Sequence, residues 1–277
     1  MLLIVEALLL ISAVLAQDNR TADDERPIYP FDMAENSVDD KFYWCTKKME
    51  YRVQTEFLKK ELSNSPTFAE AWKRAEQNHT APGDNLSKNH SVAIYAYTGD
   101  GVHVDFNEAI RFGKQKYKNE TYTHYSLHFW LTEAIQILKK TQTKCFNTYR
   151  GTTVQFDMNV KGKEVCFGQF TSSTLECKLT EVFGNTSCFE IRTCSGADVT
   201  KYSSVPHEKE VLIPPYETFK VIDVKHKAEQ KDLWCETVYI LESYKTRRFV
   251  NCAVANSGDQ VVFFNGLFML TFLLLRG

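Results

Sequence analysis

The spacing of apolar residues changes near Cys145, and this change restricts the possible folds more than any other feature of the chain. Upstream, apolar residues recur at the spacing of one helix face, most clearly in the segment 126–140. Segments 49–62 and 68–75 are predicted to be shorter helices. The sequence Asn-Ser-Pro between them predicts that one helix ends there and the next begins. The stretch 78–88 contains Pro-Gly and is predicted to be a loop.

Downstream of Cys145, the chain consists of short runs rich in β-branched and aromatic residues, separated by glycines and a Pro-Pro pair. The predicted strands are 146–154, 163–171, 188–194, 210–213, 218–225 and 234–239. Helices followed by closely spaced strands predict an α+β fold, with a helical N-terminal half packed on a mixed, largely antiparallel β core. No internal repeat or Pro- or Ser-rich linker divides the chain, so one main domain is predicted, over residues 41–255.

The first sixteen residues form an apolar run that closes on Val14-Leu15-Ala16. A short apolar run followed by small residues predicts a signal peptide over 1–16, with 17–40 as an N-terminal extension. A buried N-terminal helix is the alternative, because no basic residue precedes the run and Glu6 interrupts it.

The cysteines and glycosylation sequons also favour an extracellular protein. The chain has eight cysteines, none in the CxxC spacing of a zinc or redox site, so disulfides are expected rather than metal ligands. Their connectivity cannot be deduced from spacing. The N-x-S/T sequons predict glycosylation at Asn19, Asn78, Asn85, Asn89, Asn119 and Asn185.

The C-terminal end is a mostly apolar run over 261–275, followed only by Arg276-Gly277. A membrane-spanning helix needs about 20 apolar residues and usually a basic flank. The small residues Asn256-Ser257-Gly258 just upstream suit a GPI attachment site, although the polar spacer is short. We therefore expect 257–277 to be a GPI-attachment propeptide, with a spanning helix as the alternative. The formal charge of −2 and the lack of a basic run exclude nucleic acid as an expected partner.

Three short stretches of the strand half could carry chemistry. Arg150 lies in the predicted strand 146–154, where it could also be an ordinary edge-strand residue. Ser172 lies in a hydroxyl cluster at the end of the next predicted strand, where a cap or turn is the simple alternative. Glu208 and Glu210 lead into a predicted apolar strand, and they could share one strand face or lie on either side of a turn so that both reach one cleft. Carboxylates held close together raise one pKa, which suits acid–base chemistry, and two solvated charges are the simple alternative.

Taken in order, these stretches resemble the R-S-ExE motif of the mono-ADP-ribosyltransferases. The flanking sequences Phe-Thr-Ser-Ser-Thr and Glu-Val-Leu-Ile-Pro-Pro are similar to those of that family, and the similarity extends from about Phe42 through Cys252. With both processing signals, the chain resembles the vertebrate ecto-enzymes that are GPI-anchored or secreted. The resemblance implies the fold of that family and NAD as co-substrate.

The resemblance also implies a role for each motif residue. Arg150 would bind the diphosphate of NAD, and Gly151 would let the backbone approach the nicotinamide. Ser172 would orient the cleft and the second carboxylate. Glu210 would stabilise the cation that forms on the ribose, and Glu208 would engage the acceptor arginine.

Three further residues are implied to line the NAD site, namely Tyr97, Gln169 and Ser203. Family pairing would join Cys45 to Cys252 and Cys145 to Cys194, and leaves open the pairing of the other four, Cys166, Cys177, Cys188 and Cys235. No metal is expected, because the nicotinamide leaving group is already cationic and the reaction needs only an anion beside the forming cation and a clamp on the phosphates.

The predicted function is transfer of ADP-ribose from NAD to arginine side chains of extracellular or cell-surface proteins, at the outer face of the plasma membrane or after secretion. NAD glycohydrolase activity is one alternative, although Glu208 argues against it. A catalytically inactive surface antigen or binding ectodomain is another. A hydride-transferring NAD enzyme is not expected, because no GxGxxG follows a predicted strand.

Overall fold

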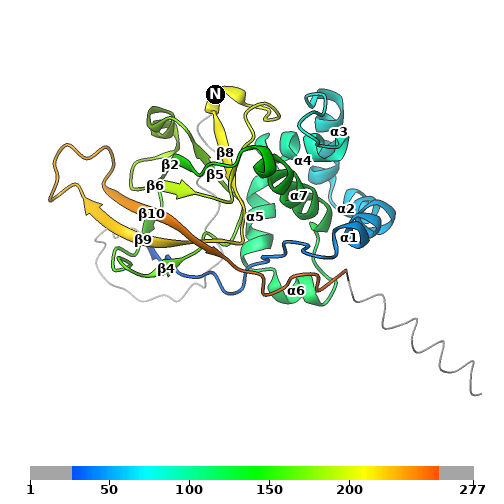
Figure 1. Cartoon of the computed structure of the whole chain (residues 1–277), viewed down its shortest axis with the longest axis horizontal. Coiled ribbons are helices and arrows are strands. Elements are labelled where there is room, and N and C mark those ends of the chain that lie inside the picture. Colours follow the sequence, from blue (N-terminus) through cyan, green and yellow to red (C-terminus); the bar gives the residue numbers. More distant parts are fainter. Residues whose placement is uncertain (1–26, 256–277) are drawn as a thin grey trace, which may run out of the picture.

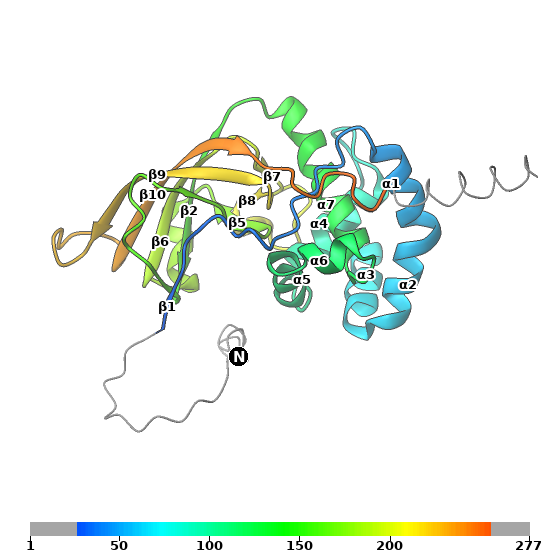
Figure 2. The ribbon, with the colours of Figure 1, turned by 90° about the horizontal axis from the view of Figure 1, so that it is seen from below.

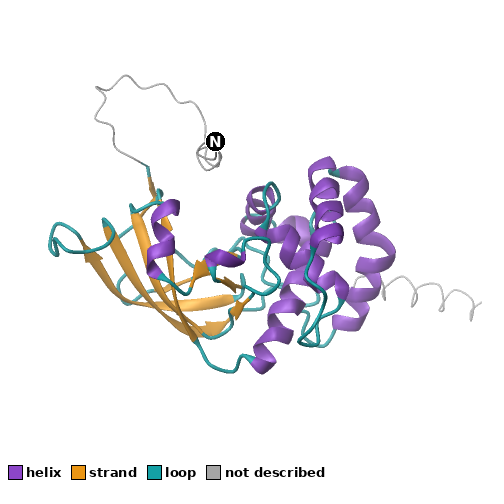
Figure 3. Ribbon diagram, turned by 90° about the horizontal axis from the view of Figure 1, so that it is seen from above, coloured by secondary structure: helices purple, strands orange, loops and turns teal. Residues whose placement is uncertain are grey.

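The computed structural model describes residues 27–255. The predicted signal peptide, the Asn19 sequon and the predicted C-terminal attachment segment lie outside the described residues. Figure 1 shows the helices gathered on one side and the strands on the other, and Figure 3 shows the same division by secondary structure. The predicted α+β fold, helical in its N-terminal half, is confirmed.

The helical half follows the predicted segments and adds three helices. Its elements are α1 (Thr46–Arg52), the π-helical turn η2 (Val53–Phe57), α2 (Leu58–Asn64), α3 (Pro66–Asn78), α4 (Lys88–Thr98), α5 (His103–Arg111), α6 (Lys114–Lys118) and α7 (Tyr125–Thr141). Ser65 caps α3, because its hydroxyl accepts from Phe68 N at 3.2 Å and Pro66 takes the first helical position. The predicted loop 78–88 separates α3 from α4.

Helix α4 was not predicted because it has no single apolar face. Its residues from His90 to Tyr97 are buried except for Tyr95. A helix surrounded by core shows no one-sided periodicity, so the pattern that revealed α7 was missing here.

The strand half contains ten short strands in the described part of the chain. They are β1 (Ile28–Tyr29), β2 (Phe146–Thr152), β3 (Gln155–Phe156), β4 (Glu164–Val165), β5 (Thr171–Thr174), β6 (Ser187–Thr193), β7 (Ala197–Asp198), β8 (Glu210–Ile213), β9 (Glu217–His226) and β10 (Thr237–Thr246). Two 3-10 segments, η3 (Cys177–Phe183) and η4 (Pro206–Glu208), lie between them.

Two of the predicted strands were wrong in their bounds. The segment 163–171 is split into β4 and β5, because the chain turns at Gly168, which has φ of +67° and packs against Ala34 so closely that a Cβ there would lie 2.3 Å from the alanine Cβ. The segment 234–239 becomes a strand only from Thr237 onward. The hydroxyl cluster around Ser172 was expected to end a strand but forms β5 itself.

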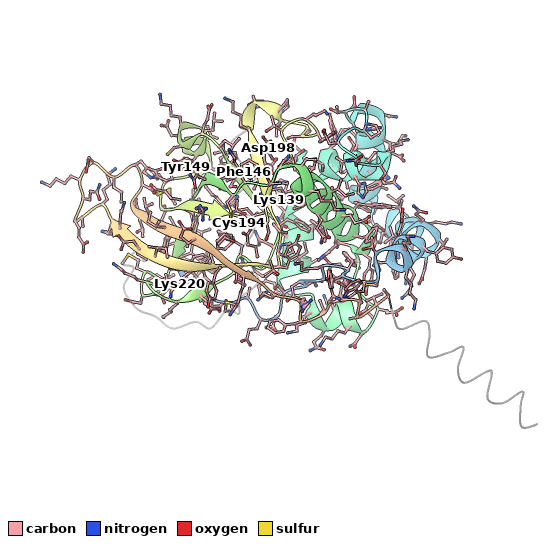
Figure 4. The ribbon with its side chains drawn as sticks, in the orientation of Figure 1. Lys139, Phe146, Tyr149, Cys194, Asp198 and Lys220 are labelled. Atoms are coloured by element: carbon pink, nitrogen blue, oxygen red, sulfur yellow. A yellow bond between two sulfur atoms is a disulfide. The ribbon has the colours of Figure 1, made fainter. Side chains whose placement is uncertain are left out.

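The eight-stranded sheet has the order β4-β9-β10-β6-β2-β5-β8-β7. Within it, only β10 and β6 pair in parallel, so the sheet is mixed and largely antiparallel, as predicted. Strands β2 and β5 are joined through a single residue pair, Tyr149 with Thr174. Tyr149 marks this junction in Figure 4.

Two apolar clusters stabilise the two sides of the molecule. The larger one fills the helical half and includes Trp130 of α7 and Phe170, which comes just before β5. The second includes Phe31 from the N-terminal segment and Phe189 of β6, with ring centroids 5.4 Å apart. The strands around the β2–β5 junction are therefore supported from the helices on one side and from the second cluster on the other.

Three disulfides close the described domain. Cys45–Cys252 joins the start of α1 to the last described segment, and Cys145–Cys194 joins the starts of β2 and of the loop after β6, as the family pairing implied. Cys188–Cys235 is a third bond that spacing could not predict. Cys166 is buried and free, and Cys177 is free and half-buried.

The sequons within the described residues differ in exposure. Asn78, Asn85, Asn119 and Asn185 are exposed, whereas Asn89 is half-buried on α4. Glycosylation at these positions stays a prediction. Among residues 27–255, no helix is both long and apolar enough to cross a bilayer.

Helix α7 begins without a side-chain cap of its own, and Glu61 of α2 takes that role. Its carboxylate accepts from the backbone N–H of Tyr125 at 2.6 Å and of Ser126 at 3.1 Å. Burial raises the pKa of Glu61 to about 7, and these hydrogen bonds act in the opposite direction. The N-terminus of α7 thus depends on one buried carboxylate.

We predict that Glu61→Ala lowers the free energy of unfolding by about 3 kcal/mol, because two buried N–H groups lose their acceptor. The matched control is Glu70→Ala on the exposed face of α3, which should change it by less than about 0.5 kcal/mol. Denaturant unfolding measures both values. Equal losses for the two variants would show that Glu61 does not hold the start of α7.

Candidate active site

The motif residues lie on three adjacent strands. Arg150 is on β2, Ser172 on β5 and Glu210 on β8, and these strands are neighbours in the sheet. Arg150 and Glu210 are 60 positions apart in the sequence, and the fold brings them together at the junction of β2 and β5. Strand pairing is weakest at this junction, because only one residue pair joins the two strands.

Arg150 lies on an interior strand of the sheet, so the alternative of an edge-strand surface residue is wrong. Its guanidinium is half-buried and donates from Nη1 to the Ser172 carbonyl at 2.8 Å. This bond ties β2 to β5 beside their single residue pair. It also holds a positive charge close enough to Glu210 to lower the pKa of that carboxyl.

The Ser172 side chain lies between two other groups of the site. It acts on the pKa values of both Glu210 and Tyr97 as a hydrogen-bonding neighbour. The Tyr97 hydroxyl donates to the Phe170 carbonyl at 3.0 Å and accepts from Asn107 at 3.1 Å. Tyr97 is only 3% exposed. It therefore packs behind Ser172 as part of α4 and does not line an open surface of the NAD site.

Glu210 is the most deeply buried acid of the motif, with 3% of its surface exposed. Burial raises its pKa to about 7, the Ser172 hydroxyl and Arg150 act to lower it, and Glu208 raises it further. Its Oε1 atom is buried and accepts no hydrogen bond from the described part of the chain. A buried carboxylate oxygen of this kind can take a hydroxyl donor or a nearby cation from a substrate.

Glu208 and Glu210 do not share one strand face. Glu208 ends η4, Lys209 follows in the left-handed region with φ of +49°, and Glu210 begins β8. The turn therefore directs the two carboxylates differently, and Glu208 stays half-buried near the surface. Burial raises the pKa of Glu208, and the neighbouring His207 and His103 lower it.

Gly151 has a packing role that the sequence did not suggest. A Cβ at this position would lie 2.3 Å from the Gly184 carbonyl oxygen and 3.0 Å from that of Thr180. The glycine thus lets the segment after β5 pass directly over β2.

Gln169 and Ser203 lie on the loops that lead into the site. Gln169 is half-buried and its Oε1 accepts from Arg111 Nε at 3.2 Å. Ser203 is 6% exposed, and its hydroxyl accepts from Val205 N at 3.1 Å, which fixes the chain just before η4. Their contacts with NAD stay a prediction.

Arg111 is a residue of this region that the sequence did not reveal. It ends α5, donates from Nη2 to the Phe167 carbonyl at 2.8 Å, and is close enough to Arg150 for the like charge to help burial lower its pKa. Two guanidinium groups in one region suit a ligand with a diphosphate. No sequence signal marked Arg111, because its place depends on how α5 packs on the loop before β5.

Within the described ranges, no group of three His, Cys, Asp or Glu side chains is arranged to hold a metal ion. The charged groups of this region are the guanidiniums of Arg150 and Arg111 and the carboxylates of Glu208 and Glu210. This set can bind a ligand that carries phosphates at one end and becomes positively charged at the other.

Comparison with known proteins gives the class. The family model described as NAD:arginine ADP-ribosyltransferase matches residues 31–238. The chain belongs to the NAD:arginine ADP-ribosyltransferase family. The residues at the β2–β5 junction suit a ligand that carries phosphates at one end and becomes positively charged at the other, which agrees with this assignment.

The most similar relatives include vertebrate enzymes of this kind. NAD(P)(+)–arginine ADP-ribosyltransferase 1 of Gallus gallus is 36% identical over 201 residues, which are 69% of this chain and 64% of that protein. T-cell ecto-ADP-ribosyltransferase 2 of Mus musculus is 32% identical over 243 residues, 84% of this chain and 80% of that protein. The matched part thus spans slightly less than two thirds of the length of the first relative.

Solved structures of the mono-ADP-ribosyltransferase ART2.2 share the fold. Its crystal structure has a TM-score of 0.68 and 30% identity, and the match covers 82% of this chain and 99% of that one. A variant of ART2.2 in complex with NAD matches equally well, with a TM-score of 0.68 and 29% identity.

We predict that NAD consumption by this protein falls as the pH drops below about 7. Glu210 is an acid with a raised pKa, so it gains a proton below that value and loses the negative charge that we expect to face the forming cation. The measurement is kcat/KM for NAD consumption as a function of pH. Glu208→Gln should move the acidic limb to lower pH, because it removes the carboxylate that raises the pKa of Glu210.

Glu210→Gln is the variant that identifies the group. It should lower NAD consumption by about 10²-fold above pH 7, where the wild-type carboxylate is charged, comparable to the loss of one electrostatic transition-state contact. The difference should shrink at lower pH, because the wild-type carboxylate gains a proton there. An acidic limb that stays near the ordinary glutamate range in the wild type would rule out Glu210 as the titrating group.

Proposed function

We propose that this chain is an NAD–protein-arginine mono-ADP-ribosyltransferase, which transfers ADP-ribose from NAD to arginine side chains of extracellular or cell-surface proteins and releases nicotinamide. The observation that carries the proposal is the pair of carboxylates at the β2–β5–β8 site. Glu210 is buried beside Arg150 and Ser172, and Glu208 lies on the turn outside it.

Glu210 stabilises positive charge on the nicotinamide ribose as the glycosidic bond breaks. Its buried Oε1 is free of protein donors in the described chain and can accept from a ribose hydroxyl. In a buried site a fixed anion is worth more than in water, because less solvent screens it. Ser172 holds the carboxylate in place, supported from below by Tyr97.

The phosphates of NAD are assigned to Arg150, with Arg111 beside it. Arg150 is already oriented by its bond to the Ser172 carbonyl, so little side-chain entropy is lost on binding. Its planar guanidinium can pair with phosphate oxygens in a two-point contact.

Glu208 is assigned to the acceptor arginine. It lies two residues from Glu210 on the outer side of the turn, where a guanidinium from another protein can reach it. A charge-assisted pair with Glu208 would both bind the acceptor and orient its nitrogen toward the ribose carbon.

Glu208→Gln separates acceptor choice from NAD chemistry. It should abolish transfer to the small arginine analogue agmatine and leave slow NAD hydrolysis largely intact, because water needs no carboxylate partner to reach the same cation. The measurement is the ratio of hydrolysis to transfer with labelled NAD, which should rise by at least about tenfold. Glu181→Gln, an exposed glutamate on η3, is the matched control and should keep the wild-type ratio.

If Glu208→Gln lowers transfer and hydrolysis together, Glu208 belongs to the NAD site, and arginine specificity loses its basis. If the wild type already hydrolyses NAD without transfer, the protein is a glycohydrolase. If it does neither, the inactive ectodomain is the correct description.

Relatives named ecto-ADP-ribosyltransferases support a location of this chain outside the cell or at its surface. We extend this to a GPI anchor at Asn256-Ser257-Gly258. The proposal is supported by the small residues at this position and by the apolar run 261–275 that follows.

Phosphatidylinositol-specific phospholipase should release the protein from the cell surface, and deletion of 261–277 should yield a secreted form. Flow cytometry and mass spectrometry of the released chain check both. Surface protein that resists the phospholipase and keeps its tail would favour a spanning helix instead.

A further inference from the structure

An exposed aromatic and basic surface surrounds the point where the described chain ends. We call it the exit surface, and it consists of Lys41, Tyr43, Trp44, Lys47 and Arg248. Trp44 is 88% exposed and Tyr43 is 48% exposed, and their ring centroids are 4.6 Å apart. A tryptophan left almost wholly in water next to a second aromatic ring is costly unless something covers it.

The backbone holds Trp44 outward at a conformational cost. Its φ is +75°, a left-handed value that bulky residues rarely adopt. Such strain persists only where the surroundings enforce it, and it concentrates at functional positions.

The surroundings that enforce it are the last described residues. The Cys45–Cys252 disulfide lies directly after Trp44, and Asn251 exchanges two hydrogen bonds with the Tyr43 backbone, each of 3.0 Å. The backbone of the exit surface is therefore held in place by covalent and hydrogen bonds, and it fixes the two aromatic rings in their exposed positions.

The charges of the exit surface are all positive. Lys41 and Arg248 line one depression of about 330 Å³ together with Tyr43 and Thr246, and no carboxylate lines it. Arg248 lies over the Tyr43 ring at 5.8 Å, and Lys41 donates to the Thr246 hydroxyl at 3.1 Å. Two cations that share a depression without a carboxylate in its lining favour an anion such as a phosphate.

The position of the surface identifies its partner. Residues 256–277, with their apolar run, continue from Ala255, three residues after Cys252. In Figure 1 the last described segment lies at the lower right, whereas β8 lies in the upper middle, and Figure 2 shows the same segment beside α1. The Cys45–Cys252 bond holds the exit surface next to this segment, so a membrane bound through the tail would meet the exit surface.

We propose that the exit surface docks on the phospholipid headgroup layer of the membrane to which the tail is attached. Trp44 and Tyr43 insert at the interface, where amphipathic aromatic rings are favoured, and Lys41 and Arg248 bind headgroup phosphates. This contact would hold the domain in one orientation relative to the membrane. This inference rests on the proposed surface location but not on the transferase activity.

The test uses the chain that ends at Gln260, which lacks the apolar run but keeps the exit surface and all three disulfides. Its co-sedimentation is measured with vesicles of phosphatidylcholine and with vesicles in which part of this lipid is replaced by phosphatidylserine. We expect binding to both, tighter to the second, with Trp44→Ala lowering the partition coefficient about tenfold on both. Lys41→Gln combined with Arg248→Gln should lower it about thirtyfold on the anionic vesicles and flatten its salt dependence.

Matched controls lie on the strand side of the molecule. Tyr244→Ala removes an aromatic ring that is 54% exposed, and Lys220→Gln combined with Lys227→Gln removes two exposed charges. Both controls should bind vesicles like the parent chain, and the thermal unfolding temperature of each variant verifies its fold.

The proposal is overturned if the parent chain binds neither kind of vesicle, or if Trp44→Ala binds as well as Tyr244→Ala. Because the chain under test has no anchor, these outcomes are independent of phospholipase release and of transfer to agmatine. A failure of docking is thus distinguishable from a failure of the proposed anchor or activity.

Discussion

Glu210 is held 3% exposed at the first residue of β8, with one oxygen that accepts no hydrogen bond from the described chain. Burial of a carboxyl in this state costs free energy, which is why its pKa rises to about 7. Neighbouring strands and helices hold the Glu210 carboxyl in this buried position. Arg150 bonds to the backbone of Ser172, and β5 lies between the two strands that supply the charges. The helical half supports β5 from behind through Tyr97 and Phe170.

The pairing of β2 with β5 is limited to one residue pair beside this site. A fully paired sheet would fill the junction with backbone hydrogen bonds, whereas one residue pair leaves side chains and carbonyls available on both strands. Because Gly151 has no side chain, the segment after β5 can pack directly against β2. The result is a buried carboxylate with cations on one side and a second, more exposed carboxylate on the turn.

Much of the fold was predictable because its strongest patterns are local. The amphipathic face of 126–140 marked α7, and the apolar run after Glu210 marked β8 to the residue. Helix α4 was missed because core surrounds it, and β5 because its sequence of hydroxyl residues is typical of a turn. Tertiary contacts decided both cases.

The candidate site was predictable in its identities but not in its geometry. The order of arginine, serine and paired glutamates with their flanks identified the motif strands. The sequence left open whether Glu208 and Glu210 share a face, and the left-handed Lys209 decides that they do not. Arg111 and the Cys188–Cys235 bond depend on approaches between distant segments, which spacing does not encode.

The proposed docking of the exit surface would orient the domain relative to the membrane. The Cys45–Cys252 bond joins the N-terminal end of the helical half to the last described segment, so the same link that closes the domain also positions Trp44. In Figure 1, β8 lies in the upper middle of the picture and the last described segment at the lower right. The candidate site and the proposed attachment point thus belong to different parts of one domain.

The central claim is that the β2–β5–β8 site transfers ADP-ribose to a guanidinium. It is tested most directly by incubating the purified wild-type protein with labelled NAD and agmatine and separating the products. The account predicts ADP-ribosyl-agmatine, with nicotinamide released in equal amount apart from slow hydrolysis. Release of nicotinamide and free ADP-ribose without the agmatine adduct, or no consumption of NAD at all, would contradict it.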